Sequence, residues 1–388
     1  MSANLIDRVL SNLKKRKSNI ENNKINSIPS SFVRFTDHLV GIEQATYYIV
    51  TGYSGGAKSQ FSYYYFVFEP ILYLFENRDK NPDLKLTVFC LPLEETAERI
   101  TQRFMSYLLF KLTNGNVLIS PKDLRSSNNK NPLPKEVLDI LESPRYKAIL
   151  NFFESCVHFE VDVSPRQFYE KIKDYCEENG TTYYKEEKIK DELGQEKTIK
   201  KFDYYEPNNP QEFILAFVDH ISLLPYTTTT LKEAIDTFSS RYLISLRNRY
   251  YVSPVIVQQQ AASNESIDAF KIDRSKPTRA NLADSKNTGK DSNIIISIYN
   301  PSAHNLKTYA GYDILEFKGN ARFIELLKNR DGNENLVIGL LFNGACSYFR
   351  ELSYPNDILG VDKDLKEAKE FVTRSRNHNY IKEELNLI

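Results

Sequence analysis

The sequence predicts an α/β fold, in which a mostly parallel, twisted sheet carries helices on both faces. Two observations support this prediction. Apolar runs of strand length alternate along the chain with longer segments of helix length, which is the pattern of an α/β sheet. The stretch GYSGGAKS (Gly52 to Ser59) lies between the first such strand and the first such helix, where a phosphate-binding loop belongs.

Composition sets outer limits on the class of protein. The chain has 388 residues, of which 41% are hydrophobic and 26% charged, as in ordinary soluble globular proteins. Its 51 Lys and Arg balance 51 Asp and Glu, which argues against a uniformly basic coat but allows a local basic channel. No apolar stretch reaches the roughly 18 residues that span a bilayer, and the N-terminus has no secretory signal. The four cysteines are scattered and predict reduced thiols in a cytoplasmic protein rather than a zinc site.

The N-terminal segment predicts an amphipathic helix over residues 3–23. Leu5, Val9, Leu10 and Leu13 recur at helical spacing, and a basic run, residues 14–17, follows them. The polar stretch at 20–31 has the composition of a linker. The helix must therefore bury its apolar stripe either on its own domain or on a neighbouring subunit. We expect three parts: a linker helix at 1–27, a core domain at 28–352 and a helical tail at 353–388.

The following elements are expected in order along the core. The predicted strands lie at 46–51, 84–91, 212–219, 253–259 and 292–300, and the predicted helices at 59–77, 96–112 and 229–249. A C-terminal β-hairpin is expected from the runs at 321–330 and 335–344. A second hairpin, highly charged, is expected at 181–206 around Leu193-Gly194-Gln195, within an insertion at about 120–210.

The stretch GYSGGAKS has the residue types that bind phosphate. Small residues let successive backbone N–H groups point at the phosphates, a lysine reaches the β- and γ-phosphates, and a hydroxyl binds Mg²⁺. Lys58 and Ser59 fill the last two parts. Ala57 replaces the final glycine of the usual pattern, which is tolerable if that residue has a negative φ. The alternative is a glycine-rich turn that only caps a helix. The predicted nucleotide-binding residues are Gly52, Tyr53, Ser54, Gly55, Gly56, Ala57, Lys58, Ser59 and Gln60.

Acidic residues follow two of the predicted strands. Asp219 ends an apolar strand, where a carboxylate can hold Mg²⁺, facing the loop's lysine and serine across adjacent strands, or simply cap a turn. His220 beside it is expected to pack or hydrogen-bond. Glu94 and Glu95 follow the second strand, where a carboxylate can orient the attacking water or merely favour a helix N-terminus.

Two further segments carry groups suited to phosphate. The strand at 253–259 runs into Gln260, and an amide at a strand end can sense a γ-phosphate or form part of a polar loop. The C-terminal hairpin carries Lys328, Asn329 and Arg330 near its tip. Such cations are either solvated or delivered to the phosphates of a neighbouring subunit.

The order of these motifs resembles the C-terminal ATPase domain of DnaB-type hexameric replicative helicases, over about residues 28–352. GYSGGAKS matches the family's phosphate loop, FCLPLEETAERITQR its catalytic-glutamate segment, FVDHISLL its Asp-ended strand and VIVQQQ its strand ending in Ser-Gln. Lys328-Asn329-Arg330-Asp331-Gly332 is nearly the family's Lys-Asn-Arg-x-Gly hairpin. The resemblance implies a RecA-like P-loop NTPase core.

The resemblance also implies a role for each site residue. Glu94 would be the catalytic base, Asp219 and Ser59 would bind the metal, and Gln260, with Gln259 as the alternative, would sense the γ-phosphate. Arg330 and Lys328 would act in trans, so a homohexameric ring is implied, and the N-terminal helix would dock on the next protomer. ATP and Mg²⁺ are the implied cofactors.

The chain departs from the family in several places. Besides Ala57, the residues Ala283, Lys286, Gly289 and Lys290 differ from the family's usual ones, which puts the DNA-loop and coupling residues there in doubt. Lys286 and Lys290 are candidates for single-stranded DNA binding or ordinary loop lysines. Only about 27 residues precede the match, so we expect the N-terminal collar domain to be absent, and primase binding through it does not carry over.

The sequence therefore predicts an ATP-dependent DNA helicase that acts as a ring on single-stranded DNA during replication, in the cytoplasm of a bacterium or a phage-infected host cell. A primase or helicase loader is a candidate partner, and no membrane is expected. Two alternatives stay open. One is another RecA-like DNA-dependent ATPase of the recombination type, and the other is a nucleotide-binding scaffold that has lost turnover.

Overall fold

The computed structural model describes residues 5–126, 132–190, 196–227, 230–261, 276–334, 336–377 and 380–382. The predicted hairpin turn Leu193-Gly194-Gln195 and the end of the predicted tail, beyond residue 382, lie outside these ranges.

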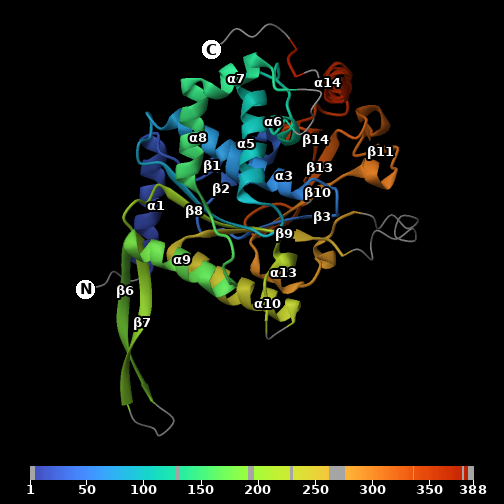
Figure 1. Ribbon diagram of the computed structural model, residues 1–388. Helices are drawn as coiled ribbons and strands as arrows, with labels where there is room; N and C mark the ends of the chain where they lie inside the picture. The colour runs from blue at the N-terminus through green and yellow to red at the C-terminus, as the bar shows by residue number, and fades with distance from the viewer. Residues whose placement is uncertain are drawn as a thin grey trace.

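A nine-stranded sheet with the order β15-β14-β13-β10-β3-β9-β8-β4-β5 lies at the centre of the molecule (Figure 1). Its strands are β3 (Tyr48–Gly52), β4 (Lys85–Pro92), β5 (Val157–Phe159), β8 (Glu212–Asp219), β9 (Ser253–Gln259), β10 (Ile294–Tyr299), β13 (Ala321–Asn329), β14 (Val337–Asn343) and β15 (Tyr348–Glu351). From β10 to β5 all neighbours are parallel, and β13, β14 and β15 extend the sheet with antiparallel pairs. The predicted mostly parallel α/β sheet and the C-terminal hairpin β13–β14 are confirmed.

Helices cover both faces of the sheet, because its central strands are apolar on both sides. Every residue of β3 and of β8 is buried. One face packs against α3 (Lys58–Tyr63), the π-helical turn η1 (Tyr64–Phe68), α4 (Glu69–Asn77), α5 (Ala97–Leu112), α7 (Lys135–Glu142) and α8 (Pro144–Cys156). The other face packs against α9 (Pro165–Glu178), η2 (Ile221–Leu223), α10 (Leu231–Thr237), η3 (Phe238–Leu243) and α11 (Ile244–Tyr250). Figure 1 shows these two layers above and below the sheet.

The remaining elements are short or lie at the edges. They are β1 (Ile28–Pro29), α2 (Val33–Thr36), β2 (Gly41–Ile42), α6 (Pro121–Leu124), η5 (Arg279–Asn281), α13 (Asn287–Asp291), η6 (Pro301–His304), β11 (Thr308–Tyr309), β12 (Tyr312–Asp313), η7 (Leu315–Phe317) and α14 (Ile358–Asn377). In Figure 1, α13 lies below the sheet with α10, whereas α14 lies above it. Among the described helices, none is long and apolar enough to cross a bilayer.

The N-terminal helix α1 (Leu5–Glu21) has no buried residue. Its apolar side chains Leu5, Ile6, Val9, Leu10, Leu13 and Ile20 are each at least 49% exposed. Two arginines of the helix contact the domain. The Arg8 guanidinium lies 4.6 Å from the ring centroid of Tyr204 and 3.7 Å from Asp203, and Arg16 donates to Glu43 at 3.2 Å. Of the two expected locations for the apolar stripe, its own domain does not cover it.

The predicted insertion contains the charged hairpin together with helices and an edge strand. Strands β6 (Gly180–Lys190) and β7 (Glu196–Pro207) pair antiparallel and project from the body of the molecule (Figure 1). Sequence analysis did not assign α7, α8, α9 or the edge strand β5. Two local signals mark these helices: Ser143 caps α8, and Ser164 caps α9 in a capping box with Gln167.

Candidate active site

The loop between β3 and α3 is shaped by its glycines. A Cβ on Gly52 would lie 2.4 Å from the carbonyl oxygen of Ile298 in the neighbouring strand, so only glycine fits there. Gly55 has a φ of +69° and open space around it. The ammonium of Lys58 donates a 2.8 Å hydrogen bond to the carbonyl oxygen of Tyr53, across the loop. Residues 52–59 therefore form the strand–loop–helix turn of a phosphate-binding loop.

Ala57 does not meet the condition under which alanine was expected to be harmless. Its φ is +74° and its ψ is 29°, the left-handed conformation, at the position directly before α3. An L-residue with a Cβ is strained there by roughly 1–2 kcal/mol, whereas glycine is not. The condition of a negative φ is thus not met, and the missing glycine leaves a strained residue in the loop.

Ser59 and Asp219 meet directly. The Ser59 hydroxyl donates a 3.0 Å hydrogen bond to Oδ1 of Asp219, which is 2% exposed. β9 lies between β3 and β8 in the sheet, so the two groups meet across an intervening strand and not from adjacent strands as expected. Burial, with Glu94 and Glu95 nearby, raises the pKa of the Asp219 carboxyl to about 7, although the Ser59 hydroxyl and Lys58 oppose this.

Glu94 and Glu95 have different surroundings. The backbone N–H of Glu94 donates to the carbonyl oxygen of Asp219 at 3.2 Å, which fixes the end of β4 beside the end of β8. Its carboxylate is 49% exposed and lies 3.9 Å from Nε2 of His220. Glu95 instead accepts two hydrogen bonds from the guanidinium of Arg103, one of them at 2.8 Å. Glu94 is therefore the carboxylate that can act on a water beside the loop.

The three glutamines that follow one another at the end of β9 and just beyond it have separate partners. Gln260 is 4% exposed, donates to Thr51 Oγ1 at 2.9 Å and accepts from the N–H of Thr278 at 3.0 Å. Gln258 is turned inward, toward the backbone of Ala283 and Ser285. The amide of Gln259 lies 3.3 Å from Nε2 of His220. The expected sensor, Gln260, is thus fully occupied as an internal brace, and the geometry favours the alternative, Gln259.

His220 was missed as a site residue. It lies between the Gln259 amide and the Glu94 carboxylate, and burial lowers its pKa. The signal that could have identified it is its position: it follows Asp219 at the carboxyl edge of a parallel sheet, where sites on such folds gather.

Comparisons with known proteins bear on the fold of the chain. No family model matches the chain, and no curated protein matches its sequence. The solved ATPase domain of another protein has a TM-score of 0.62 at 13% identity, over 91% of this chain and 100% of that domain. A DnaB-like replicative helicase, solved with its interactions with primase, has a TM-score of 0.58 at 13% identity, over 90% of this chain and 67% of that one.

The chain has the fold of a DnaB-like ATPase domain. The fold that the motif order implied is therefore confirmed, including the RecA-like arrangement of the parallel strands. At this level of identity the likeness does not extend to individual residues.

In this DnaB-like fold Arg330 lies far from the phosphate loop of its own chain. Its N–H donates to the carbonyl oxygen of Asn293, just before β10, whereas Gly52 approaches Ile298 near the other end of β10. Five residues of strand separate the two edges by about 17 Å. The Arg330 side chain is exposed, and its Nη2 donates to the carbonyl oxygen of Lys290 at 2.6 Å.

Lys328 points into its own chain. The residue is 5% exposed, and its ammonium donates to the backbone carbonyls of Gly289, at 2.7 Å, and Ser292, and more weakly to that of Lys290. Burial, with Arg330 and Arg279 nearby, lowers its pKa to about 8. This geometry does not favour the expected trans role for Lys328. It braces the end of α13, next to Arg330.

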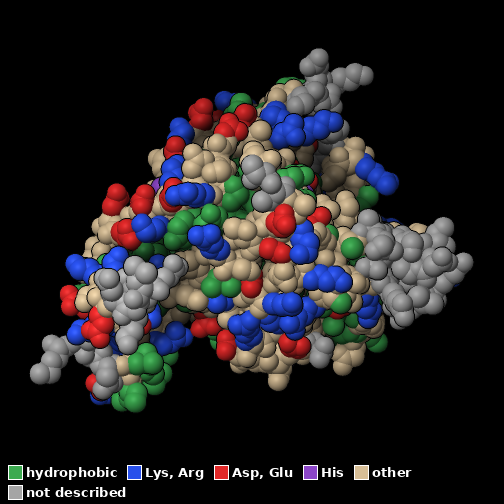
Figure 2. Space-filling model, turned by 90° about the horizontal axis from the view of Figure 1, so that it is seen from below, with side chains coloured by type: hydrophobic (Ala, Val, Ile, Leu, Met, Phe, Trp, Pro, Cys, Tyr) green, Lys and Arg blue, Asp and Glu red, His purple; other side chains and the backbone are tan. Residues whose placement is uncertain are grey.

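Basic side chains gather on the face that contains α10 and α13. Figure 2 shows this concentration of Lys and Arg on the underside of the molecule. Lys286, Lys290, Arg279 and Arg330 are all exposed there. Lys290 lies beside Arg330, whose guanidinium donates to the Lys290 carbonyl oxygen, and Lys286 lies at the N-terminal end of α13.

The residues fit a magnesium nucleotide. A hydroxyl and a buried carboxylate stand 3.0 Å apart, and burial makes that carboxylate a favourable partner for a cation. Backbone N–H groups at the start of α3 and the Lys58 ammonium supply positive potential for phosphates. No cluster of three or more His, Cys, Asp or Glu that could hold a metal by protein ligands alone occurs in the described ranges.

Proposed function

We propose that this chain is an ATP-hydrolysing DNA helicase or translocase that works as a homohexameric ring on single-stranded DNA during replication, in the cytoplasm. One observation carries the proposal. The loop of residues 52–59, the Ser59–Asp219 pair and the Glu94 carboxylate converge at one edge of a DnaB-like sheet, while Arg330 lies at the opposite edge.

Lys58, Ser59 and Asp219 form the binding part of the proposed site. Bound Mg²⁺ and ATP would supply the phosphoanhydride and the Lewis acid. Lys58 can exchange its bond to the Tyr53 carbonyl for one to a phosphate oxygen with little movement. Ser59 would bind the ion directly, and Asp219 would hold its water shell and offset its charge.

Glu94 is the proposed base, and Gln259 the proposed sensor. The Glu94 carboxylate is free of Arg103 and held beside Asp219, so it can orient a water and take its proton. Gln259 would report on the γ-phosphate, and His220 between them joins the sensor to the base.

The position of Arg330 supports the proposed ring. About 17 Å of sheet separates Arg330 from its own loop, so in the proposed ring Arg330 would complete the site of an adjacent subunit. An arginine supplied in trans stabilises charge on the transferring phosphoryl group and is worth orders of magnitude in rate. The exposed apolar stripe of α1 supports the same assembly, since a neighbouring protomer would cover it.

Single-stranded DNA is the proposed track of this motor. Zero net charge is compatible with that, because only one surface needs to follow the phosphate backbone. Lys286 and Lys290 stay the candidates for DNA contact. A primase or a helicase loader stays a candidate partner, the former because the DnaB-like helicase structure includes interactions with primase.

Two other functions are separable by experiment. The left-handed Ala57 favours a nucleotide-binding scaffold that has lost turnover. A recombination-type ATPase would hydrolyse ATP on DNA without unwinding it. The test is unwinding of a labelled DNA fork by the purified chain with ATP, beside the Lys58→Ala variant. Strand release that needs ATP and Lys58 supports the helicase. DNA-stimulated hydrolysis without strand release leaves the recombination type, and nucleotide binding without hydrolysis leaves the scaffold.

A further inference from the structure

A pocket distinct from the proposed active site lies on the other side of the sheet from α13. It has a volume of about 550 Å³, within the range of ligand-binding cavities, and is bounded by the end of α5, β15, one side of α14 and Lys382. Its floor is aromatic: the Phe110 ring centroid lies 4.8 Å from that of Tyr348 and 5.9 Å from that of Phe371. None of the residues of the proposed active site lines it.

The carboxylates that line this pocket are already paired. Glu367 accepts two hydrogen bonds from Arg350, one of them at 3.2 Å. Glu370 pairs with Lys382 at 3.1 Å and with Arg374 at 3.5 Å. Both acidic groups are thus neutralised by cations of the same chain.

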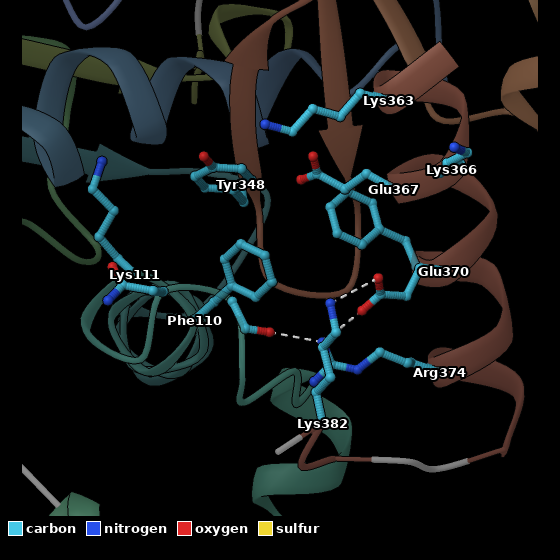
Figure 3. A pocket seen from close by; sticks show the side chains of 12 residues that line it. Phe110, Lys111, Tyr348, Lys363, Lys366, Glu367, Glu370, Arg374 and Lys382 are labelled. Carbon is cyan, nitrogen blue, oxygen red and sulfur yellow. Dashed lines mark hydrogen bonds and ion pairs between the residues drawn. The ribbon is translucent and has the colours of Figure 1, made fainter. Parts of the chain in front are cut away.

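Two lysines of α14 that line the pocket have no such partner. Lys363 and Lys366 are exposed, and neither has an ion pair or hydrogen bond with any residue in the described part of the chain. Figure 3 shows the Lys363 side chain reaching from α14 across the pocket toward Tyr348, with Lys111 on the opposite side. Lys111 pairs with Glu69 at 2.8 Å, so the surplus positive charge of the pocket comes from Lys363 and Lys366.

Tyr348 adds a hydrogen-bond donor. Its hydroxyl has no partner among the described residues, and burial raises the pKa of the phenol to about 12, so it keeps its proton. The pocket thus combines apolar rings with an ammonium and a phenol donor. That combination suits a ligand with a carboxylate close to an apolar side chain.

We propose that this pocket, which we call the α14 pocket, binds a short acidic peptide segment of a partner protein, with an aromatic side chain on Phe110 and a carboxylate between Lys363 and Tyr348. Nucleic acid fits less well, because phosphate backbones bind along an extended track of cations, whereas this pocket offers two unpaired lysines on one helix. The proposal does not depend on ATP hydrolysis.

The test is fluorescence anisotropy of the full chain with a dye-labelled peptide that alternates aspartate with phenylalanine. We expect saturable binding below about 100 µM, lost when lysine replaces aspartate or alanine replaces phenylalanine in the peptide. Lys363→Glu weakens binding about tenfold or more, and Tyr348→Phe several-fold. The matched control is Lys369→Glu, on the same helix but paired to Glu316 and outside the pocket, which leaves binding unchanged.

Three results would overturn the proposal. The first is no peptide binding below about 1 mM. The second is peptide binding that Lys363→Glu and Lys369→Glu affect equally. The third is evidence for a different occupant of the pocket. That evidence would be a labelled oligothymidine that binds in the peptide's place and is released by Lys363→Glu, or a subunit association that Lys363→Glu abolishes. These would assign the surface to nucleic acid or to a second copy. Lys363 is exposed, so its substitution is not expected to unfold the chain.

Discussion

Ser59 and Asp219 are joined by a 3.0 Å hydrogen bond although 160 residues and one intervening strand separate them. The bond ties the start of α3 to the carboxyl end of β8. It brings the hydroxyl of the phosphate loop and the buried carboxylate to the distance at which they could share a hydrated Mg²⁺ ion.

Asp219→Asn tests the state of that carboxyl in the absence of nucleotide and Mg²⁺. Its folded pKa, about 7, is raised above the ordinary value of 3.8, so the native state binds the extra proton between those values. Stability therefore falls as the pH rises through this window. The asparagine variant should equal the wild type near pH 4 and be more stable at pH 8, by at most about 4 kcal/mol at about 1.4 kcal/mol per pKa unit.

Urea unfolding at both pH values measures the difference. A variant that is less stable than the wild type at pH 8 would show that Asp219 is stabilised as a carboxylate even without a cation.

Ala57→Gly should raise the free energy of unfolding by up to about 1 kcal/mol. Glycine relieves the strain of a φ of +74°, although it also loses more entropy on folding. Ala234→Gly in α10 is the opposite control, since a right-handed helical site should lose about 1 kcal/mol. The urea midpoints of both variants, compared with that of the wild type, show whether Ala57 is strained. Equal losses in the two would mean that Ala57 is not strained.

Glu94→Gln should lower kcat by about 10²-fold or more while nucleotide affinity stays within a few-fold, because a general base is lost. Glu95→Gln is the matched neighbour. It breaks the bond to Arg103, so it should lower stability and change kcat little. Steady-state hydrolysis with nucleotide titration separates the two. A larger loss of kcat in Glu95→Gln would reverse the assignment.

Gln259→Ala and Gln260→Ala should differ in kind. Removing Gln259 takes away the amide beside His220, so hydrolysis should fall about tenfold or more without loss of stability. Removing Gln260 frees Thr51 and the N–H of Thr278, so the melting temperature should fall. Thermal unfolding and hydrolysis rates, measured together, distinguish them. A catalytic loss confined to Gln260→Ala would restore Gln260 as the sensor.

Much of the fold was predictable because its signals are local. The continuous apolar run of β8 and the turn at residues 52–59 identify a doubly covered parallel sheet from the sequence alone. β5 was not predictable, since Val157–Phe159 is too short to show a pattern and joins the sheet only through pairing with β4. The left-handed backbone conformation of Ala57 was also not predictable from the sequence, because the loop around it imposes that φ.

Side-chain direction limited what the sequence could say about the site. Glu94 and Glu95, or Gln259 and Gln260, are adjacent in the chain but point to opposite environments, and only the positions of Arg103 and Thr51 separate them. Lys328 and Arg330 lie on one strand edge. Yet the Lys328 ammonium donates to the backbone carbonyl oxygen of Gly289 in α13, whereas the Arg330 side chain is exposed.

The most direct test of the account is ATP hydrolysis by the purified chain with and without single-stranded DNA, beside Lys58→Ala and Arg330→Ala. We predict turnover that DNA stimulates, with each variant reduced by about 10³-fold or more. Lys58→Ala should lose nucleotide binding, whereas Arg330→Ala should keep it. An equimolar mixture of the two variants should regain some turnover, because some interfaces then pair an intact loop with an intact arginine. A wild-type chain that binds nucleotide but does not hydrolyse it, with or without DNA, would contradict the account.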